Sequence, residues 1–594
     1  MKKILSIILC LILIGSVSVT AFCASDEITV TADYQIYIGS DGELAAVADY
    51  LNKYIDKVCG FTLKVNTDSE MPDKAIAISV DESAKAGYTV TSDSENIFIT
   101  GASLRNATDG VCGFLSKYGG VHYYTAYTIE TGDSIKIPVN ESYSYTPYFE
   151  NTDTDWYSPC DVDYSLFNGI SGSVYRKVPS KLGGGAEYIS SFCHTFTSQF
   201  CNADKYFEEY PECFASVAGI RSKKELCLSN PKTLEIVTDE VFALLEEKHD
   251  PSAELQIISL TQADNLVFCT CPDCLLKYLK YQSISGMMIE FANTISNRVQ
   301  EAGYDNVAID TFAYMYTRSA PKNIVPDDGV IVRLCSLECC FSHPLNDKTC
   351  SANVNFGDDL RDWSKICDRL YVWDYTTNYC NFIGIFPDFD VLQKNMQFFS
   401  ENNVKGVYEE GNYYATECDT EFNELRSYLI AKLMQNPYCD LEAERAAFLD
   451  AYYGEGGKYI GEFVDIISES ASTEHMSIYS SMIDTCNLSC LQVKKCDDLW
   501  KKAEAAASGE ELDHVKNSEL AWRYWKYQNN ESEYRNIFKR ADTRAEFDNE
   551  LAEKPLETYR ECSDTKAFFL GIFQKLRFIL EDIAYPILVL ITIL

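Results

Sequence analysis

The chain is poor in histidine and in positive charge. Only 6 of its 594 residues are histidine, which argues against a metal centre built from several histidines. Its 51 lysine and arginine residues stand against 89 aspartate and glutamate residues, so the formal net charge is -38. Dense binding of nucleic acid needs a basic footprint. We therefore expect no nucleic-acid partner, and we attribute the acidity to solubility outside the cell.

The chain also lacks an internal apolar run of membrane-spanning length. Lys2 and Lys3 precede an apolar run over residues 4–17, followed by small-residue cleavage points, so residues 1–24 are predicted to be a signal peptide. At the other end residues 583–594 are almost wholly apolar, but a membrane-spanning helix needs about 20 residues. We expect a secreted or cell-surface protein, with at most a weak membrane association through its C-terminal segment.

Cysteine, in contrast, is abundant. The chain has 24 cysteines, and 16 of them lie between Cys160 and Cys439. In an exported protein such cysteines predict disulfides, whose pairing the sequence does not give. The densest group is Cys269, Cys271 and Cys274. Zinc would need a fourth ligand there, for which Cys227 is a candidate. We favour disulfides that shape this loop, and we expect no bound metal and no cofactor.

Residues 146–440 alternate between apolar, β-branched runs and amphipathic helical stretches. Eight runs are predicted as strands, at 148–152, 166–175, 188–196, 255–260, 306–312, 329–334, 369–373 and 404–408. Helices are predicted at 231–248, 284–302, 356–367, 391–402 and 422–434. Alternating strands and helices form a parallel sheet with helices outside, and eight such units close as a (β/α)8, TIM-like barrel.

The flanking regions have different patterns. In residues 27–145, strands are predicted at 28–30, 75–80, 88–91 and 96–100, and helices at 44–51 and 104–118, which makes a small α/β domain. No proline occurs between Pro437 and Pro555, and residues 441–560 are rich in good helix formers, so they predict a helical domain. The fold class is thus α/β: a small α/β domain, a barrel, helices, and an apolar segment of residues 561–594.

Acidic residues end several of the predicted barrel strands. Parallel barrels carry their chemistry at these C-terminal ends, and a glycosidase needs one protonated and one ionised carboxyl group there. Asp264 ends the fourth strand, Asp374 the seventh and Glu409 the eighth. By analogy with retaining glycosidase barrels, we interpret Asp264 as the proton donor and Glu409, or else Asp374, as the second carboxylate. A cap or turn role is the alternative for Asp264.

Aromatic residues and one histidine accompany these acids. Tyr314, Trp373 and Tyr375 follow or end strands, and aromatic faces stack on sugar rings. His194 follows the third strand and is positioned to hydrogen-bond a substrate hydroxyl or carboxylate. Ordinary packing is the alternative for each aromatic residue, and a structural hydrogen bond is the alternative for His194.

Several short motifs are spread over residues 150–460. They are His194, Tyr210-Pro211-Glu212-Cys213-Phe214, Gly219-Ile220-Arg221, Leu226-Cys227-Leu228-Ser229-Asn230-Pro231, Gln262-Ala263-Asp264, the three cysteines, Trp373-Asp374-Tyr375, Gly406-Val407-Tyr408-Glu409-Glu410-Gly411, Leu425-Arg426-Ser427-Tyr428-Leu429 and Tyr452-Tyr453-Gly454. Together they resemble a bacterial family, the domain of unknown function 4838, which is placed among glycosidase-like barrels. Residues 27–145 resemble the small α/β domain that precedes the barrel in α-glucuronidases and hexosaminidases.

The resemblance implies an architecture and a reaction class. It supports Asp264 and Glu409 as catalytic residues, and His194 and Arg221 as substrate contacts. This chain has Ala263 where the family often has asparagine, and Glu410 where glutamine is common. We place Glu410 with the substrate-binding residues. The α-glucuronidase-like layout suggests an acidic sugar, such as a uronic acid, in the substrate.

The sequence therefore predicts a secreted glycoside hydrolase that cuts a polysaccharide or glycan with two carboxyl groups. A non-catalytic glycan-binding surface protein on a degenerate barrel is the main alternative. A structural or adhesive surface protein, with the helical domain as its binding part, is the second. Assays of sugar binding and of turnover distinguish these alternatives. The first predicts sugar binding without turnover, and the second predicts no sugar binding.

Overall fold

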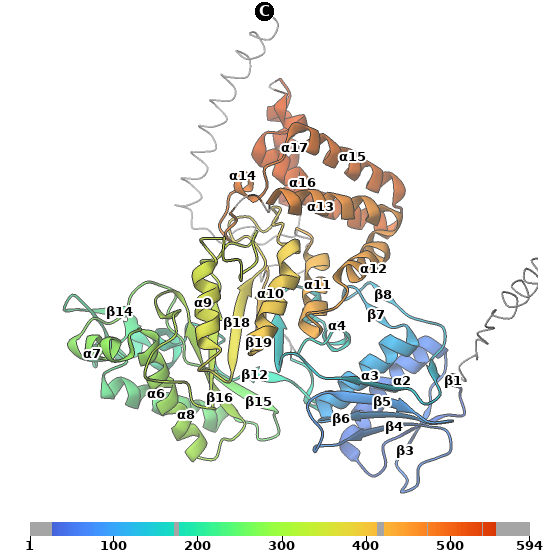
Figure 1. Ribbon diagram of the computed structural model, residues 1–594, viewed down its shortest axis with the longest axis horizontal. Helices are drawn as coiled ribbons and strands as arrows, with labels where there is room; N and C mark the ends of the chain where they lie inside the picture. Colours follow the sequence, from blue (N-terminus) through green and yellow to red (C-terminus); the bar gives the residue numbers. More distant parts are fainter. Residues whose placement is uncertain are drawn as a thin grey trace, which may run out of the picture. The chain divides into compact units, whose positions relative to one another are not determined.

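The structure is a computed structural model that describes residues 27–171, 177–412, 421–471, 473, 475–536 and 538–553 (Figure 1). The predicted signal peptide and the apolar segment 561–594 lie outside these residues. The chain divides into two compact units, one ending with residues 131–145 and the other formed by residues 122–130 and everything from residue 146 on. Within the described residues, no helix is both long and apolar enough to cross a membrane.

The first unit is built on a six-stranded mixed sheet against which two helices pack. In spatial order the strands are β10 (Ser142–Tyr145), β5 (Tyr88–Ser92), β6 (Ile97–Gly101), β4 (Ala75–Val80), β2 (Gln35–Tyr37) and β3 (Lys64–Asn66). A separate antiparallel pair joins β1 (Glu27–Thr29) to β9 (Lys136–Pro138). The helices are α2 (Ala45–Cys59) and α3 (Leu104–Gly119). Ser103 caps α3 through its side chain, and Gly120, with φ of 63°, ends it.

The second unit contains a nearly closed barrel of seven parallel strands. In spatial order they are β11 (Asn151–Thr154), β19 (Val404–Glu410), β18 (Leu370–Tyr375), β17 (Val330–Cys335), β16 (Val307–Ala313), β15 (Leu255–Ser259) and β12 (Ala186–Tyr188). All six neighbouring pairs are parallel. The predicted TIM-like barrel is confirmed as a fold class, but with seven strands rather than eight among the described residues.

The strand predicted at 166–175 is wrong where the structure describes it. Residues Val162–Phe167 form the helix α4, whose N-terminus is capped by the Asp161 side chain accepting the Tyr164 N–H at 2.9 Å. Gly169 then turns the chain with φ of 69°. Local capping and turn chemistry outweighed the aromatic and β-branched composition of this run. Residues 172–176 lie outside the described part.

Side chains fill the barrel interior in layers, as they do in TIM barrels. The lowest layer is apolar and consists of Ile257, Ala308, Ile331 and Tyr371, all buried. The next layer is polar. Asp310 lies two residues after Ala308 on β16, Arg333 lies two residues after Ile331 on β17, and the two form a buried ion pair. The open ends of the strands lie above that layer, so the interior changes from apolar to polar towards the C-terminal end.

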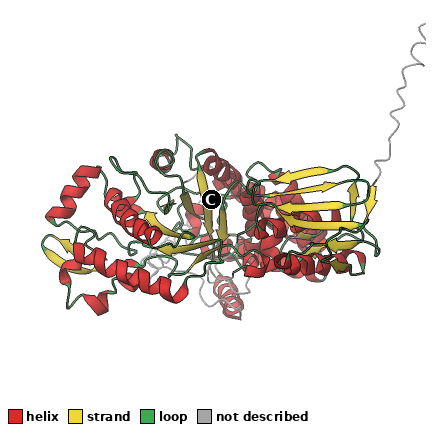
Figure 2. Ribbon diagram, turned by 90° about the horizontal axis from the view of Figure 1, so that it is seen from below, coloured by secondary structure: helices red, strands yellow, loops and turns green. Residues whose placement is uncertain are grey.

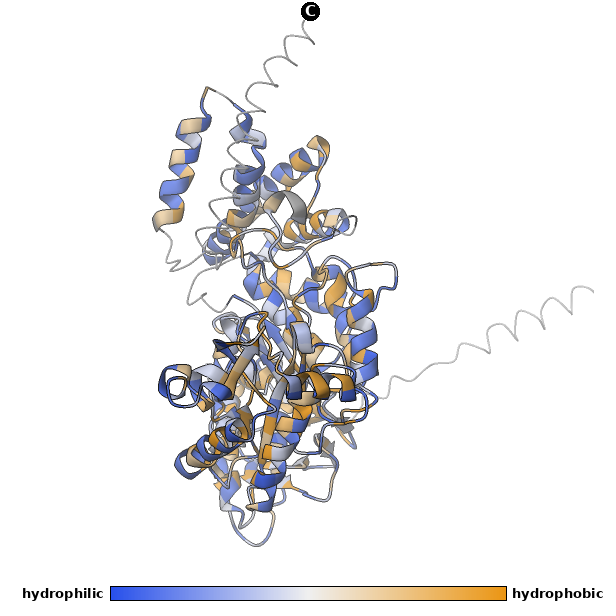
Figure 3. Ribbon diagram, turned by 90° about the vertical axis from the view of Figure 1, so that its left-hand side faces the viewer, coloured by the Kyte–Doolittle hydropathy of each residue, from blue (hydrophilic) through white to orange (hydrophobic). Residues whose placement is uncertain are grey.

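Helices cover the outside of the barrel (Figures 1 and 2). They are α6 (Pro231–Lys248), α8 (Ser285–Glu301), α9 (Val354–Trp363), α10 (Phe389–Glu401) and α11 (Asn423–Gln435), close to the five predicted helices. In the ribbon coloured by hydropathy, hydrophobic and hydrophilic residues alternate along the helices, as expected where one face is buried (Figure 3). The loop between β12 and β15 carries an antiparallel hairpin, β13 (Phe214–Val217) and β14 (Ile220–Leu226), and the next loop leads into α7 (Pro272–Tyr281).

Five helices of more than ten residues follow the barrel in the described part of the chain. They are α12 (Leu441–Tyr453), α13 (Gly457–Ala471), α15 (Cys490–Ala506), α16 (Glu510–Asn529) and α17 (Arg540–Glu553). The segment after α13 returns to the barrel. The Met476 carbonyl accepts the Phe341 N–H at 2.7 Å, and the Ile478 carbonyl accepts the Tyr379 N–H at 2.8 Å. This segment thereby becomes part of the rim of the barrel.

Candidate active site

A pocket of about 310 Å³ lies at the C-terminal ends of the barrel strands. Strands β16 to β19 all contribute their last residues, and the segment after α13 contributes Tyr479. The described residues that line it are Asp155, Phe192, Cys193, His194, Asp264, Phe312, Tyr314, Cys335, Leu337, Trp373, Tyr375, Tyr379, Tyr408, Glu410 and Tyr479. The pocket therefore occupies the position at which TIM-barrel enzymes carry their active sites.

Asp264 and Glu410 are two of the carboxyl groups in this pocket, and each is held by an aromatic neighbour. Tyr314 donates its hydroxyl to Oδ1 of Asp264 at 2.8 Å. Trp373 donates its indole Nε1–H to Oε2 of Glu410 at 2.6 Å. The bond to Asp264 uses only its Oδ1, so its Oδ2 remains for a substrate or a transferable proton.

Asp155 is a third pocket carboxyl that sequence reasoning missed. It follows β11 directly and is only 4% exposed. Its Oδ1 accepts the backbone N–H of Gly411 at 2.5 Å, which fixes the chain just after Glu410. Burial raises the pKa of Asp155 to about 6, against the opposing hydrogen bonds from Gly411 and Tyr408. Its position directly after a barrel strand is the signal that could have identified it.

Glu409 and Asp374, predicted as alternatives for the second catalytic carboxylate, do not line the pocket. Successive side chains of a strand point to opposite faces. Trp373, Tyr375 and Glu410 face the pocket, so the residues between or beside them face away from it. Both carboxyl groups are buried, at 1% and 3% exposure. The structure therefore brings Glu410, and not Glu409 or Asp374, into the same pocket as Asp264.

The aromatic residues predicted to bind substrate, Tyr314, Trp373 and Tyr375, all line the pocket. Trp373 is packed edge-on against Tyr408, with ring centroids 4.8 Å apart and an interplanar angle of 86°. Phe312 contacts Trp373 in the same way, at 5.6 Å. Edge-on contacts of this kind hold the rings in place, so their faces are fixed relative to the pocket.

His194, predicted as a substrate contact, also lines the pocket. Its backbone has a φ of 56°, a left-handed conformation that is uncommon for a residue other than glycine. Its Nδ1 lies 2.7 Å from the carbonyl oxygen of Gln262, and because a carbonyl only accepts, Nδ1 carries the proton. In this tautomer Nε2 is the nitrogen that can accept a hydrogen bond from a sugar hydroxyl.

Arg221, predicted as a substrate contact, is not among the described residues of the pocket wall. It lies on the β13–β14 hairpin, where its Nη1 donates to the carbonyl oxygens of Glu212 at 3.1 Å and Phe214 at 2.6 Å. These bonds tie the hairpin to the turn that precedes it. The structure gives Arg221 a role in shaping this loop.

Two further charged residues lie below the pocket and were not identified from sequence. Arg333 forms an ion pair with Asp310, and both side chains are at most 1% exposed. Tyr188 donates its hydroxyl to Oδ2 of Asp310 at 2.8 Å. The Arg333 guanidinium lies 4.3 Å from the ring centroid of Phe192, a pocket residue. The sequence feature that could have identified this ion pair is the arginine inside the otherwise apolar run of residues 329–334.

The pocket also contains two free thiols. Burial raises the pKa of Cys193 to about 11 and that of Cys335 well above its usual value. Both groups are therefore neutral thiols at physiological pH, and thiols in this state are poor nucleophiles. The carboxyl groups are the stronger candidates for catalysis.

Residues 123–465, more than half of the chain, match the sequence model of a family described as "Domain of unknown function (DUF4838)". The chain belongs to this family. No curated protein matches it. Among solved structures, the chain is similar to a GH138 enzyme targeting pectin rhamnogalacturonan II, with a TM-score of 0.45 and 11% identity over 84% of this chain and 69% of the other.

Two other similar structures are β-N-acetylhexosaminidases. The match to a mutant Streptomyces plicatus β-hexosaminidase in complex with GlcNAc has a TM-score of 0.40 and 12% identity, and covers 70% of this chain and 93% of the other. The match to the enzyme of Bacteroides fragilis NCTC 9343 has a TM-score of 0.41 and 10% identity, and covers 73% of this chain and 94% of the other.

Proposed function

We propose that this DUF4838 protein is a glycoside hydrolase that uses Asp264 and Glu410 as its pair of carboxyl groups. The observation that carries the proposal is the presence of both acids in one pocket, at the C-terminal end of a parallel barrel, beside aromatic walls. Glycoside hydrolases typically have two carboxyl groups that flank the glycosidic bond, and aromatic side chains on which the sugar ring stacks.

In the proposed reaction Asp264 protonates the glycosidic oxygen as the bond to the anomeric carbon breaks. Tyr314 occupies Oδ1 of Asp264, so the proton is carried by Oδ2. Glu410 either removes a proton from the attacking water or attacks the anomeric carbon itself, depending on the separation of the two groups. Asp155 acts as a positioning residue, because it holds the backbone N–H of Gly411, the residue after Glu410.

We propose a neutral sugar as the substrate unit in this pocket. Of the described residues that line it, three are carboxylic acids and none is a lysine or an arginine. A uronic acid, suggested by the α-glucuronidase-like layout, would bring a further negative charge beside them. His194 offers a hydrogen-bond acceptor at Nε2 and the aromatic walls offer apolar faces, and both suit the hydroxyl and C–H groups of a neutral sugar.

The predicted signal peptide further supports action outside the cytoplasm, on a polysaccharide or on the glycans of another cell. The acidic composition agrees with an exported, soluble chain. Export is testable by comparing the N-terminus of the protein recovered from the culture medium with that of the full-length chain.

The test is a screen of the purified protein, from about Ser25 onward, against plant and host glycans, with release of reducing sugar as the readout. Asp264→Asn is assayed in parallel, because it keeps the size of the side chain and removes the acid. Release by the wild type that the variant loses is the expected result. Binding of a glycan by both proteins with no release by either would contradict the proposal and favour a glycan-binding function.

A further inference from the structure

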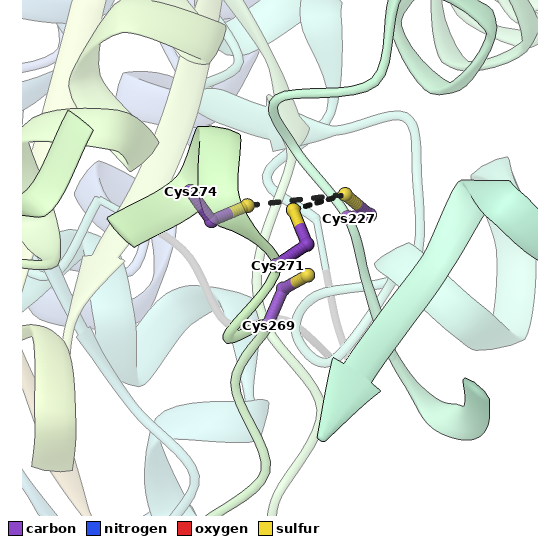
Figure 4. A group of neighbouring side chains, drawn as sticks. All are labelled: Cys227, Cys269, Cys271 and Cys274. Atoms are coloured by element: carbon purple, nitrogen blue, oxygen red, sulfur yellow. Dashed lines mark hydrogen bonds between the residues drawn. The ribbon is translucent and has the colours of Figure 1, made fainter. Parts of the chain in front are cut away.

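Four cysteines from two separate segments meet in one group (Figure 4), and none of them is among the residues that line the pocket. Cys227 follows strand β14, whereas Cys269, Cys271 and Cys274 lie in the loop after Asp264 and in the first turn of α7. Their sulfur atoms all lie within 4.8 Å of one another. All four are free thiols in this structure, which differs from the disulfides expected from the sequence.

The spacing of the sulfur atoms fits a metal better than a covalent pair. Cys227 Sγ lies 3.7 Å from Cys271 Sγ and 3.8 Å from Cys274 Sγ. A disulfide needs about 2.05 Å between sulfur atoms. Zinc–thiolate bonds of about 2.3 Å place the sulfur atoms of a tetrahedral site ~3.8 Å apart. The observed separations therefore match the edges of a tetrahedron around Zn²⁺.

The surroundings of the group resemble the outer shell of a structural metal site. The backbone N–H of Ser216 donates to Cys269 Sγ at 3.2 Å, and Ser229 Oγ lies 3.1 Å from Cys274 Sγ. Such N–H and O–H donors stabilise metal-bound thiolates. Cys227, Cys269 and Cys274 are at most 2% exposed, so the site is closed to solvent on most sides.

We propose that Cys227, Cys269, Cys271 and Cys274 bind one structural Zn²⁺ ion. Four protein thiolates complete a tetrahedral shell and leave no open position, which assigns the ion to structure and not to catalysis. Each thiol loses its proton to solvent as the metal binds. The assignment does not depend on the proposed glycosidase activity.

The ion would hold the β13–β14 hairpin against the loop that carries Asp264. Several hydrogen bonds already join the same two segments. Among them, Thr270 N–H donates to the Ser216 carbonyl at 2.7 Å, and Ala263 N–H donates to Oε2 of Glu225 at 2.8 Å. Ala263 directly precedes Asp264. Metal loss is therefore expected to loosen the backbone next to the proposed proton donor.

A second group carries the same kind of inference on separate observations. Cys340, His343, Cys350 and His475 offer ligand atoms that all lie within 4.8 Å of one another. Cys340 Sγ is 3.2 Å from His343 Nδ1, and Cys350 Sγ is 3.6 Å from His475 Nδ1. Zinc bonds of about 2.0–2.3 Å to nitrogen and sulfur give edges of ~3.5 Å in a Cys2His2 site. We infer a second Zn²⁺ site, which joins the loop after β17 to the segment that carries Tyr479.

Metal content per chain tests both sites. We expect about two zinc equivalents in wild-type protein purified from zinc-supplemented cells. The double variant Cys271→Ser plus Cys274→Ser should retain about one equivalent, and so should the double variant Cys340→Ser plus Cys350→Ser. Cys213→Ser is the matched control, because Cys213 is a fully buried free thiol near the hairpin that belongs to neither group, and it should keep both ions.

A wild type without zinc, or variants that keep the full metal content of the wild type, would overturn the corresponding site. If a variant fails to fold, Co²⁺ exchange into the wild type replaces it, because tetrahedral cobalt–thiolate centres absorb intensely in the visible range. Alkylation gives a further readout: the Cys227 group should resist reagent until a chelator is added. Disulfides between these residues in the purified wild type would contradict the proposal. Absence of glycosidase activity would leave these metal readouts unchanged.

Discussion

Asp374 and Glu409 are direct partners across the parallel strands β18 and β19, and both carboxyl groups are buried on the side of the sheet that faces away from the pocket. Ser336 donates its hydroxyl to Asp374 Oδ1. Burial raises the pKa of Asp374 to about 6, and burial together with the charge of Asp374 raises the pKa of Glu409 well above its usual value. The pair therefore retains at least one proton near neutral pH, which makes the stability of the fold dependent on pH.

Asp374→Asn is predicted to stabilise the protein at pH 7 and to flatten its pH dependence. The pKa of Asp374 is about 6 in the folded protein against an ordinary 3.8, so the folded state binds the proton more tightly and stability falls as pH rises from 3.8 to 6. Removing the ionisable group should raise the free energy of unfolding at pH 7 by about 1–3 kcal/mol. Urea unfolding at several pH values measures this. Asp368→Asn, at an exposed residue two positions before the same strand, is the control and should change neither quantity.

Tyr314→Phe is predicted to reduce kcat by ~10-fold, because a hydrogen bond between neutral groups is worth about 0.5–1.5 kcal/mol. The tyrosine hydroxyl holds one oxygen of Asp264, and its loss lets the carboxyl group rotate. Tyr304→Phe is a matched control outside the pocket wall, and it should retain wild-type kinetics. Unchanged kcat in Tyr314→Phe would show that the orientation of Asp264 does not depend on this bond.

His194→Asn is predicted to raise KM by ~10-fold with a smaller change in kcat, which is the cost of about one hydrogen bond. Asparagine tolerates the left-handed backbone conformation of this position and keeps the loop in place, but it does not present the imidazole nitrogen. Steady-state kinetics on the best substrate of the glycan screen measures the change. An equal loss from His194→Asn in kcat and in kcat/KM would instead indicate a role in the chemical step.

Arg333→Met is predicted to destabilise the fold by about 3–5 kcal/mol, because it leaves the buried carboxylate of Asp310 without its partner. The double variant Arg333→Met/Asp310→Leu removes both charges and should recover much of that loss. Denaturant unfolding of the single and double variants measures both effects. A double variant no more stable than Arg333→Met would contradict a simple ion-pair account.

The outer helices of the barrel were predictable because their signals are local. Asn230 and Pro231 mark the start of α6 by capping and by the fixed φ of proline, and the helix spans Pro231–Lys248 as predicted. The central strands β15 to β19 were equally predictable from the sequence, since each is a short apolar run in a chain that alternates strands with helices. The seven-strand count was not predictable, because the run 166–175 was predicted as a strand, whereas Leu166 and Phe167 end the capped helix α4 and Gly169 then turns the chain.

The site was predictable only in part. The end of β19 identified a pair of adjacent glutamates, but the choice between Glu409 and Glu410 depends on which face of the strand points inward, and a shift of one residue reverses it. Asp155 and Arg333 each carried a sequence signal, a position directly after a strand and a charge inside an apolar run, but their partners Gly411 and Asp310 lie on other strands or loops and needed three-dimensional information. The Cys227 group shows the same limit, since its fourth ligand comes from a separate segment of the chain.

The most direct test of the account compares Glu410→Gln with Glu409→Gln. The two substitutions make the same chemical change at adjacent positions of one strand, but only Glu410 lines the pocket with Asp264. We expect Glu410→Gln to lower kcat/KM by ~10²–10⁴-fold on the best glycan of the screen, the range for loss of general acid–base catalysis, and Glu409→Gln to stay within ~10-fold of the wild type. An inactive Glu409→Gln beside an active Glu410→Gln, both folded, would contradict the assignment of this pocket as the catalytic site.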